Sequence, residues 1–219
     1  MPTVRAVALL LALLASAHAA AAQVISIADA RSQPAGTVVT VEGSVTVPSG
    51  DFASSTFDQG FGLQDATAGV YVSTSDNPNL NFNRRVRVTG EVADDGFGVL
   101  ILRPASLADV ETLPGASLVA PTPEATGTIG EATEGLLVEV TGTVTRPVGN
   151  DLPFGYSVFV DDGSGEVQIF ISASTGINPF AIPFIEVGAR ITAVGQSGQF
   201  QTQFEVLPRF RGDLHAAVP

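Results

Sequence analysis

The chain of 219 residues contains no cysteine, no tryptophan and no lysine, and it has only two histidines. Without cysteine it can form no disulfide and offers no thiol for acylation or for a zinc site. His215 is the only histidine after residue 22, so a serine nucleophile would have a single candidate base, close to the C-terminus. We therefore predict that the protein is not an enzyme, and we expect neither a metal nor a cofactor.

The charge is strongly one-sided. All 22 acidic residues but only nine of the ten arginines follow residue 22, which leaves a net charge of −13 beyond that point. Such a charge keeps a protein soluble and repels polyanions at long range.

The N-terminus has the layout of a secretory signal peptide. Arg5 precedes an uninterrupted apolar run, residues 6–15, which is too short to span a bilayer. Small residues follow, with A-x-A cleavage patterns at residues 17–19 and 20–22. We predict that residues 1–22 are removed on export, and that the mature protein is extracellular or periplasmic without stable membrane insertion.

One segment occurs twice. GTVVTVEGSVTVPSG (Gly36–Gly50) returns ninety-nine residues later as GLLVEVTGTVTRPVG (Gly135–Gly149), with eight of the fifteen positions identical. In each copy the remaining chain offers a hairpin, a polar or Pro-rich loop and a second hairpin, built from β-branched residues that alternate with period two. The pattern predicts an all-β protein with two related halves.

Five strands in about eighty residues favour a small barrel over a β-sandwich, which needs more strands. The expected fold is two tandem OB-fold barrels, each a five-stranded Greek-key barrel, at residues 23–113 and 131–219. The Pro-, Thr- and Gly-rich segment 114–130 is predicted to be a linker. Gly43 and Gly142 lie in mid-strand, where a strand has to bend as its sheet closes.

Four segments form a recognisable set: IADARSQPAGTVVTVEGSVT, FGLQDATAGVYV and RVRVTGEV in the first copy, and EGLLVEVTGTVT in the second. Together they resemble the OB-fold accessory domains of bacterial extracellular nucleases. VDDGSGEVQIF is similar to the hairpin of single-strand DNA-binding OB domains. The resemblance implies a nucleic-acid-binding module, accessory to a nuclease. No further domain follows the second copy, so we expect a binding module without catalytic residues.

Strands two and three of an OB barrel usually hold the ligand, together with the loops after strands one and four. In the first copy these elements supply Gln64 and Tyr71, with Phe52 and Phe57 close by. In the second copy they supply Phe159, Gln168 and Phe170. Aromatic faces at such positions can stack bases or sugar rings.

The alternative for each aromatic side chain is the barrel interior. Phe61 shares a strand face with Leu63, and Tyr156 shares one with Val158, so we expect both aromatics to point inward. Phe159 lies on the opposite face and is expected to point outward.

Arginines form one cluster, Arg84, Arg85 and Arg87, to which Arg103 or Arg190 could add. Arg85 and Arg87 share a strand face and could contact a phosphate backbone together. The alternative is a solvated face on which they pair with some of the many acids.

Two further motifs have simpler explanations. The acidic run 161–166 lacks the ligand order of an EF-hand and is typical of a tight turn. The Arg-Gly-Asp tripeptide at 211–213 is interpreted as a chance match. The leading hypothesis is binding of single-stranded nucleic acid; the alternative is a carbohydrate- or protein-binding module, which the acidic charge favours.

Overall fold

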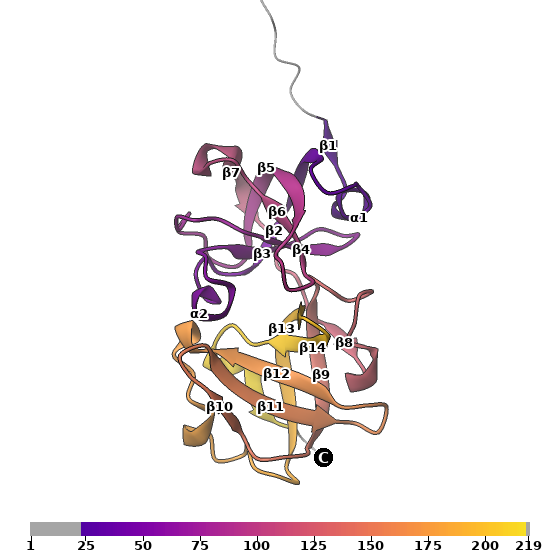
Figure 1. The fold of residues 1–219 in the computed structure, drawn as a ribbon, viewed down its shortest axis with the longest axis vertical. Coiled ribbons are helices and arrows are strands. Elements are labelled where there is room, and N and C mark those ends of the chain that lie inside the picture. Colours follow the sequence, from indigo (N-terminus) through magenta and orange to yellow (C-terminus); the bar gives the residue numbers. More distant parts are fainter. Residues whose placement is uncertain (1–22, 218–219) are drawn as a thin grey trace, which may run out of the picture.

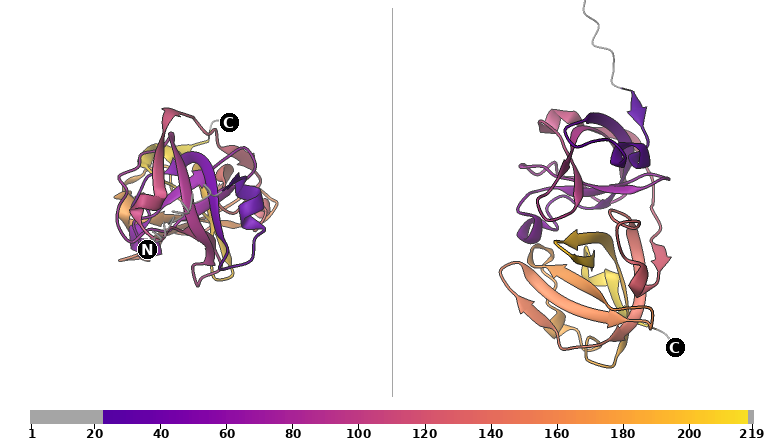
Figure 2. Two further views of the ribbon diagram at one scale, coloured as in Figure 1. Left: turned by 90° about the horizontal axis from the view of Figure 1, so that it is seen from above. Right: turned by 45° about the vertical axis from the view of Figure 1, so that its right-hand side comes forward.

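The structure, a computed structural model, describes residues 23–217. Figure 1 shows two β-rich halves stacked along the long axis of the molecule, indigo to magenta above and orange to yellow below. The turned view on the right of Figure 2 shows the same stacking. We call the upper half barrel 1 and the lower half barrel 2.

Barrel 1 is a closed ring of five strands. They are β2 (Val38–Val47), β3 (Phe61–Gln64), β4 (Gly69–Val72), β5 (Arg84–Asp94) and β6 (Leu100–Arg103). The order around the ring is β2-β3-β4-β6-β5, and β5 pairs back to β2. Only the β4–β6 pair in this ring is parallel. This is the strand order of the OB-fold.

Barrel 2 repeats the topology. Its strands are β9 (Leu137–Val144), β11 (Gly155–Asp161), β12 (Val167–Ser172), β13 (Arg190–Phe200) and β14 (Gln203–Leu207). The order β11-β12-β14-β13-β9 is closed by pairing of β9 with β11, and β12–β14 is the parallel pair. The prediction of an all-β chain with two five-stranded OB-like barrels is confirmed.

Period-two alternation fills the two interiors. Phe61 and Leu63 are fully buried in the core of barrel 1, and Val158 is fully buried in that of barrel 2. Tyr156 is half-buried and packs against the second core. Each fully buried apolar side chain stabilises its barrel by about 1.5–3 kcal/mol. The inward orientation expected for Phe61 and Tyr156 is confirmed.

Two glycines let the first strand of each barrel pass from one neighbour to the next. A Cβ on Gly43 would lie 2.8 Å from the carbonyl oxygen of Gln64, and one on Gly142 would lie 2.9 Å from the backbone nitrogen of Asp161. Next to Gly43, β2 changes partner from β5 to β3. The close approach excludes any side chain at these bends.

Short elements flank the rings. The flanking strands are β1 (Val24–Ile25), β7 (Val110–Ala116), β8 (Thr122–Glu124), β10 (Gly149–Asp151) and β15 (Leu214–Ala216). The helices are α1 (Ile27–Arg31) and α2 (Ala53–Thr56), with 3-10 turns at Leu107–Asp109, Thr126–Thr128, Ala173–Thr175, Pro179–Ala181 and Arg211–Asp213. Within the described residues, no helix has the length and apolar character needed to cross a membrane.

The segment 114–130, expected as a linker, is in large part attached to the barrels. β7 pairs with β5 as far as Ala116, and β8 pairs in parallel with β9. The hydroxyl of Thr126 donates to Asp162 at 2.8 Å, which ties the following turn to the β11–β12 hairpin. Residues 117–121 remain as the irregular connection between the two sheets. The composition of the segment predicts that it forms no helix, but it does not predict whether short stretches pair with neighbouring strands.

Candidate functional site

The outer faces of the two barrels meet, and three residues expected to bind a ligand lie in that contact. Tyr71 on β4 and Phe170 on β12 are buried in one hydrophobic cluster shared by both barrels. Gln64 is buried, and its Oε1 accepts a hydrogen bond from the backbone N–H of Leu137 at 2.8 Å. The other buried members of this contact cluster are Val47, Phe52, Ile101 and Leu207.

Gln64, Tyr71 and Phe170 are therefore not open to a ligand while the barrels are in contact, and that expectation is corrected. The three side chains were selected because they lie on the strands with which OB barrels usually hold ligands. The position of a residue on such a strand carries no information on whether solvent or a second barrel covers its side chain.

Tyr71 is held by hydrogen bonds as well as by packing. Its hydroxyl donates to Asp58 Oδ1 at 2.7 Å, and the same oxygen accepts the backbone N–H of Gly60 at 3.0 Å. Burial, and next to it the negative charge of Asp58, raise the pKa of Tyr71 well above its usual value. The phenol of Tyr71 is thus a neutral hydrogen-bond donor that barrel 2 covers.

Polar contacts cross the interface too. Arg31 pairs with Glu134 at 2.9 Å, and the same carboxylate oxygen accepts the backbone N–H of Leu100 at 3.2 Å. Burial raises the pKa of Glu134 although the Arg31 charge acts in the opposite direction. Arg209 of barrel 2 donates to the carbonyl oxygen of Thr46 at 2.8 Å. The contact is therefore more polar than either barrel core.

Two of the three arginines clustered on β5 are paired with neighbouring acids. Arg87 lies 2.6 Å from Glu42 and 2.9 Å from Glu111, and Arg85 lies 3.6 Å from Glu42. Among the described residues, the remaining three predicted arginines make no ion pair: Arg84, Arg103 and Arg190. Arg84 and Arg103 are exposed on barrel 1 and Arg190 on barrel 2, so the predicted arginines form no single cationic surface within residues 23–217.

A different arginine stands on the accessible face of barrel 2. The guanidinium of Arg146 lies 3.8 Å from the ring centroid of Phe159, on the outer face of β11. Arg146 also pairs with Glu166, and its side chain is 52% exposed. Gln168 lies opposite Phe159 in the ladder and donates to the Ser157 hydroxyl at 3.1 Å. Phe159 and Gln168 are thus brought together with a cation that the sequence analysis did not select.

The sequence contained a signal for Arg146. It stands at the position of the fifteen-residue repeat where the first copy has Val47. Val47 is fully buried in the contact cluster, whereas Arg146 lies over an aromatic ring. A charge that replaces an apolar residue within a repeat marks a place where the two copies do different things.

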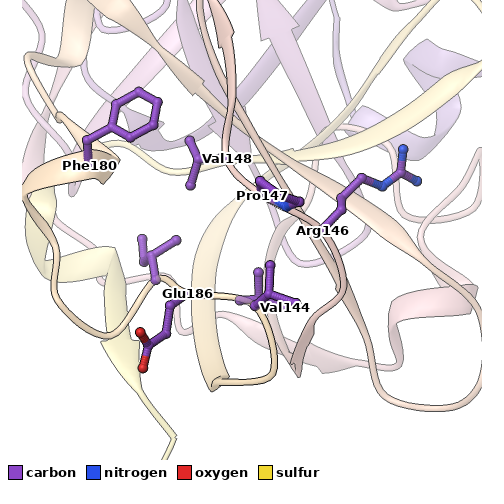
Figure 3. Close-up of a pocket in the computed structure, with 8 residues that line it drawn as sticks. Val144, Arg146, Pro147, Val148, Phe180 and Glu186 are labelled. Carbon is purple, nitrogen blue, oxygen red and sulfur yellow. The ribbon is translucent and has the colours of Figure 1, made fainter.

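A hollow of about 270 Å³ adjoins this face. Its walls are mainly apolar, and the lining residues are Val144, Arg146, Pro147, Val148, Phe180, Ile185, Glu186 and Val187. In Figure 3, Phe180 and Arg146 stand on opposite sides of the hollow, and the guanidinium of Arg146 points away from it. Phe180 is 61% exposed, so an aromatic face is available at this edge.

The acidic run after β11 is a turn held by its own side chains. Asp161 Oδ1 accepts the backbone N–H groups of Gly163 and Gly165, and Asp162 accepts that of Ser164. The hydroxyl of Ser164, its backbone N–H and the hydroxyl of Thr126 all donate to Asp162, and these hydrogen bonds keep the pKa of Asp162 well below its usual value. Within residues 23–217, no three His, Asp or Glu side chains are grouped as metal ligands.

Comparison with known proteins shows only weak similarity to solved structures. No family model and no curated protein matches the chain. The OBody AM1L10 bound to hen egg-white lysozyme is 18% identical over 47% of this chain and 100% of its own, with a TM-score of 0.37. The tetrameric p202 HIN2 structure is 11% identical, covers 84% of this chain and 94% of its own, and has a TM-score of 0.36.

The Ifi202 HINa domain in complex with 20bp dsDNA is 11% identical, covers 79% of this chain and 92% of its own, and has a TM-score of 0.37. Such low scores say nothing about the ligand of this chain. The fold assignment rests on the strand order and on the two ring closures described above.

Proposed function

We propose that the protein is a non-catalytic binding module that takes a short stretch of single-stranded nucleic acid on the outer face of β11 and β12. The observation that carries the proposal is the stacked pair of Arg146 and Phe159, with Gln168 beside it. An aromatic ring and a guanidinium together offer a base both a stacking surface and a charge. We infer further that the protein acts outside the cytoplasm, because residues 1–22 are predicted to be a signal peptide, and that it is an accessory to an extracellular nuclease, which the resemblance of its segments to nuclease accessory domains supports.

The charges set the character of this binding. The net charge beyond residue 22 is −13, and Arg146, the arginine on the proposed face, is paired with Glu166, so little free positive charge is available there for phosphates. For a single strand, each neutralised phosphate contributes about 0.7 to the slope of log K against log salt. Stacking should therefore supply most of the affinity, and the slope should stay between about 0.7 and 1.4.

Fluorescence anisotropy with a labelled oligo(dT) tests the proposal. Phe159→Ala is expected to weaken binding about tenfold, or ~1.4 kcal/mol, because a stacking partner is lost. Arg146→Ala should weaken it by a similar factor and flatten the salt dependence. Arg190→Ala, which removes an exposed arginine elsewhere on barrel 2, is the matched control and should change little. Equal affinity of all four proteins would disprove the assignment of this face.

A carbohydrate is the second candidate ligand, favoured by the apolar hollow and the exposed ring of Phe180. A sugar ring needs an aromatic face and polar neighbours but no cation, so it suits an acidic protein. Titration with a panel of oligosaccharides would then show affinity that does not respond to salt and that falls on Phe180→Ala. Absence of DNA binding together with that result would replace the first proposal by the second.

A further inference from the structure

We propose that barrel 2 is an intramolecular cover over a second ligand face on barrel 1, and that the two barrels part to expose it. The inference that the barrels separate rests on structural observations and does not depend on the proposed function. The class of ligand for the exposed face, single-stranded nucleic acid, rests on the proposed function.

The covered side chains have the chemistry of a ligand face. Tyr71 lies on β4, the third strand of the ring, and Phe52 lies in the loop after β2, the first strand. Gln64 ends β3 and presents its amide to the same contact. These are the strands and the loop with which OB barrels usually hold ligands. In barrel 1 this face is occupied by Phe170 and Leu207 of barrel 2.

Nothing in the strand pairing prevents separation. Each ring closes with strands of its own half, and among the described residues no strand of barrel 1 pairs with a strand of barrel 2. The connection runs through residues 117–121, which have no regular structure. The barrels can therefore move apart without breaking a sheet.

The contact also leaves polar atoms without partners. Of the five buried side-chain oxygens that lack a hydrogen bond within residues 23–217, four lie at the contact: Thr46 Oγ1, Glu134 Oε2, Gln196 Oε1 and Gln199 Oε1. Thr46 and Glu134 hydrogen-bond across it. Gln196 and Gln199 are the nearest neighbours of a Cβ placed on Gly62 or Gly98 of barrel 1. Buried polar atoms without partners oppose burial, so water gained on opening offsets part of the apolar contact that is lost.

The rim of the contact is open to solvent. Three phenylalanine pairs bridge the barrels there, with ring centroids 5.2–5.9 Å apart: Phe57–Phe154, Phe82–Phe210 and Phe97–Phe200. All six rings are at least 38% exposed. The contact is thus bordered by exposed rings that a ligand can reach.

A reversible lock tests the inference. The hydroxyls of Ser54 and Ser172, on opposite barrels, lie 2.7 Å apart. Since the chain has no cysteine, the double variant Ser54→Cys/Ser172→Cys can form one disulfide only. If that disulfide does not form, Ser54→Cys/Ser174→Cys offers a second pair, because Ser174 N–H donates to the Ser54 hydroxyl at 3.0 Å. Ser54→Cys alone is the control.

The readout without ligand is hydrogen exchange at the Leu137 amide, whose bond to Gln64 exists only while the barrels touch. We expect exchange at least about tenfold slower in the oxidised double variant than in its reduced form or in Ser54→Cys, because exchange then requires a larger unfolding event. Equal rates in the oxidised and reduced forms would overturn the proposal.

Oligo(dT) binding then identifies the exposed face. In a Phe159→Ala background, which weakens the barrel 2 site, the reduced protein should bind more tightly than the oxidised protein, in which the second face stays covered. Identical binding by both forms would show that the covered face takes no nucleic acid. If no form binds oligo(dT) at all, the proposed function fails, while the Leu137 exchange rates still decide whether the barrels part.

Discussion

Replacing Gly69 by alanine is expected to lower the free energy of unfolding by about 3 kcal/mol or more, among the largest effects of a single methyl group. Gly69 opens β4, and a Cβ there would lie 2.0 Å from the carbonyl oxygen of Gly135. That oxygen belongs to the backbone of barrel 2, so no side-chain rotation relieves the overlap. The barrels must move apart, and the hydrogen bond between Gln64 and Leu137 is lost with the contact.

Thermal unfolding followed by circular dichroism measures this effect. A loss of about 3 kcal/mol corresponds to a melting temperature lower by roughly 10 °C for a chain of this size. Gly130→Ala is the matched control, because a Cβ there has no neighbour closer than 3.9 Å and should cost little. Equal stability of the two variants would mean that Gly69 and Gly135 do not face each other as described.

The fold could be predicted because it is encoded locally and twice. Alternation placed Phe61 in the core, and the repeated mid-strand glycines Gly43 and Gly142 marked both bends. A period of two and a turn residue act over a few positions, so they can be recognised in one sequence. Strand count then favoured the ring closures that the structure shows.

The site could be predicted only in part, because it depends on how one barrel meets the other. The ladder registers make Tyr71 and Ile101 of barrel 1 equivalent to Gln168 and Glu205 of barrel 2. The outer face of barrel 1 is thus apolar where that of barrel 2 is polar. An apolar outer face indicates that something covers it. A single sequence does not name the cover, and this is why Tyr71 was expected to face a ligand.

Glu205 lies in an unusual environment for a carboxyl group. It lies on β14 on the same side as Leu207, a member of the contact cluster, with Gln168 and Gly198 as its ladder neighbours. Its side chain is buried, and it makes no ion pair among the described residues. Burial alone raises the pKa of Glu205 from 4.5 to about 8. At neutral pH the group is therefore largely protonated.

The stability of the protein is consequently expected to fall as the pH rises from 6 to 9. A carboxyl group with a raised pKa binds its proton more tightly in the folded state, so its contribution is complete below pH 4.5 and is lost as the pH passes about 8. Between pH 6 and pH 9 the loss amounts to roughly 3 kcal/mol. Glu205→Gln keeps a neutral group of the same shape and should remove this decline.

Denaturant unfolding of both proteins at several pH values between 6 and 9 measures the difference. Glu186→Gln, which removes an exposed carboxylate from the same barrel, should follow the wild-type profile. A wild-type profile that stays flat while Glu205→Gln is also flat would show that Glu205 is already ionised and hydrated.

If the stability of the wild type declines with pH as expected, the ionised carboxylate of Glu205 should favour separation of the barrels. The group lies beside the contact cluster, so separation would expose it to water. The Leu137 amide should then exchange faster at pH 9 than at pH 6, beyond the intrinsic effect of hydroxide, in the wild type but not in Glu205→Gln.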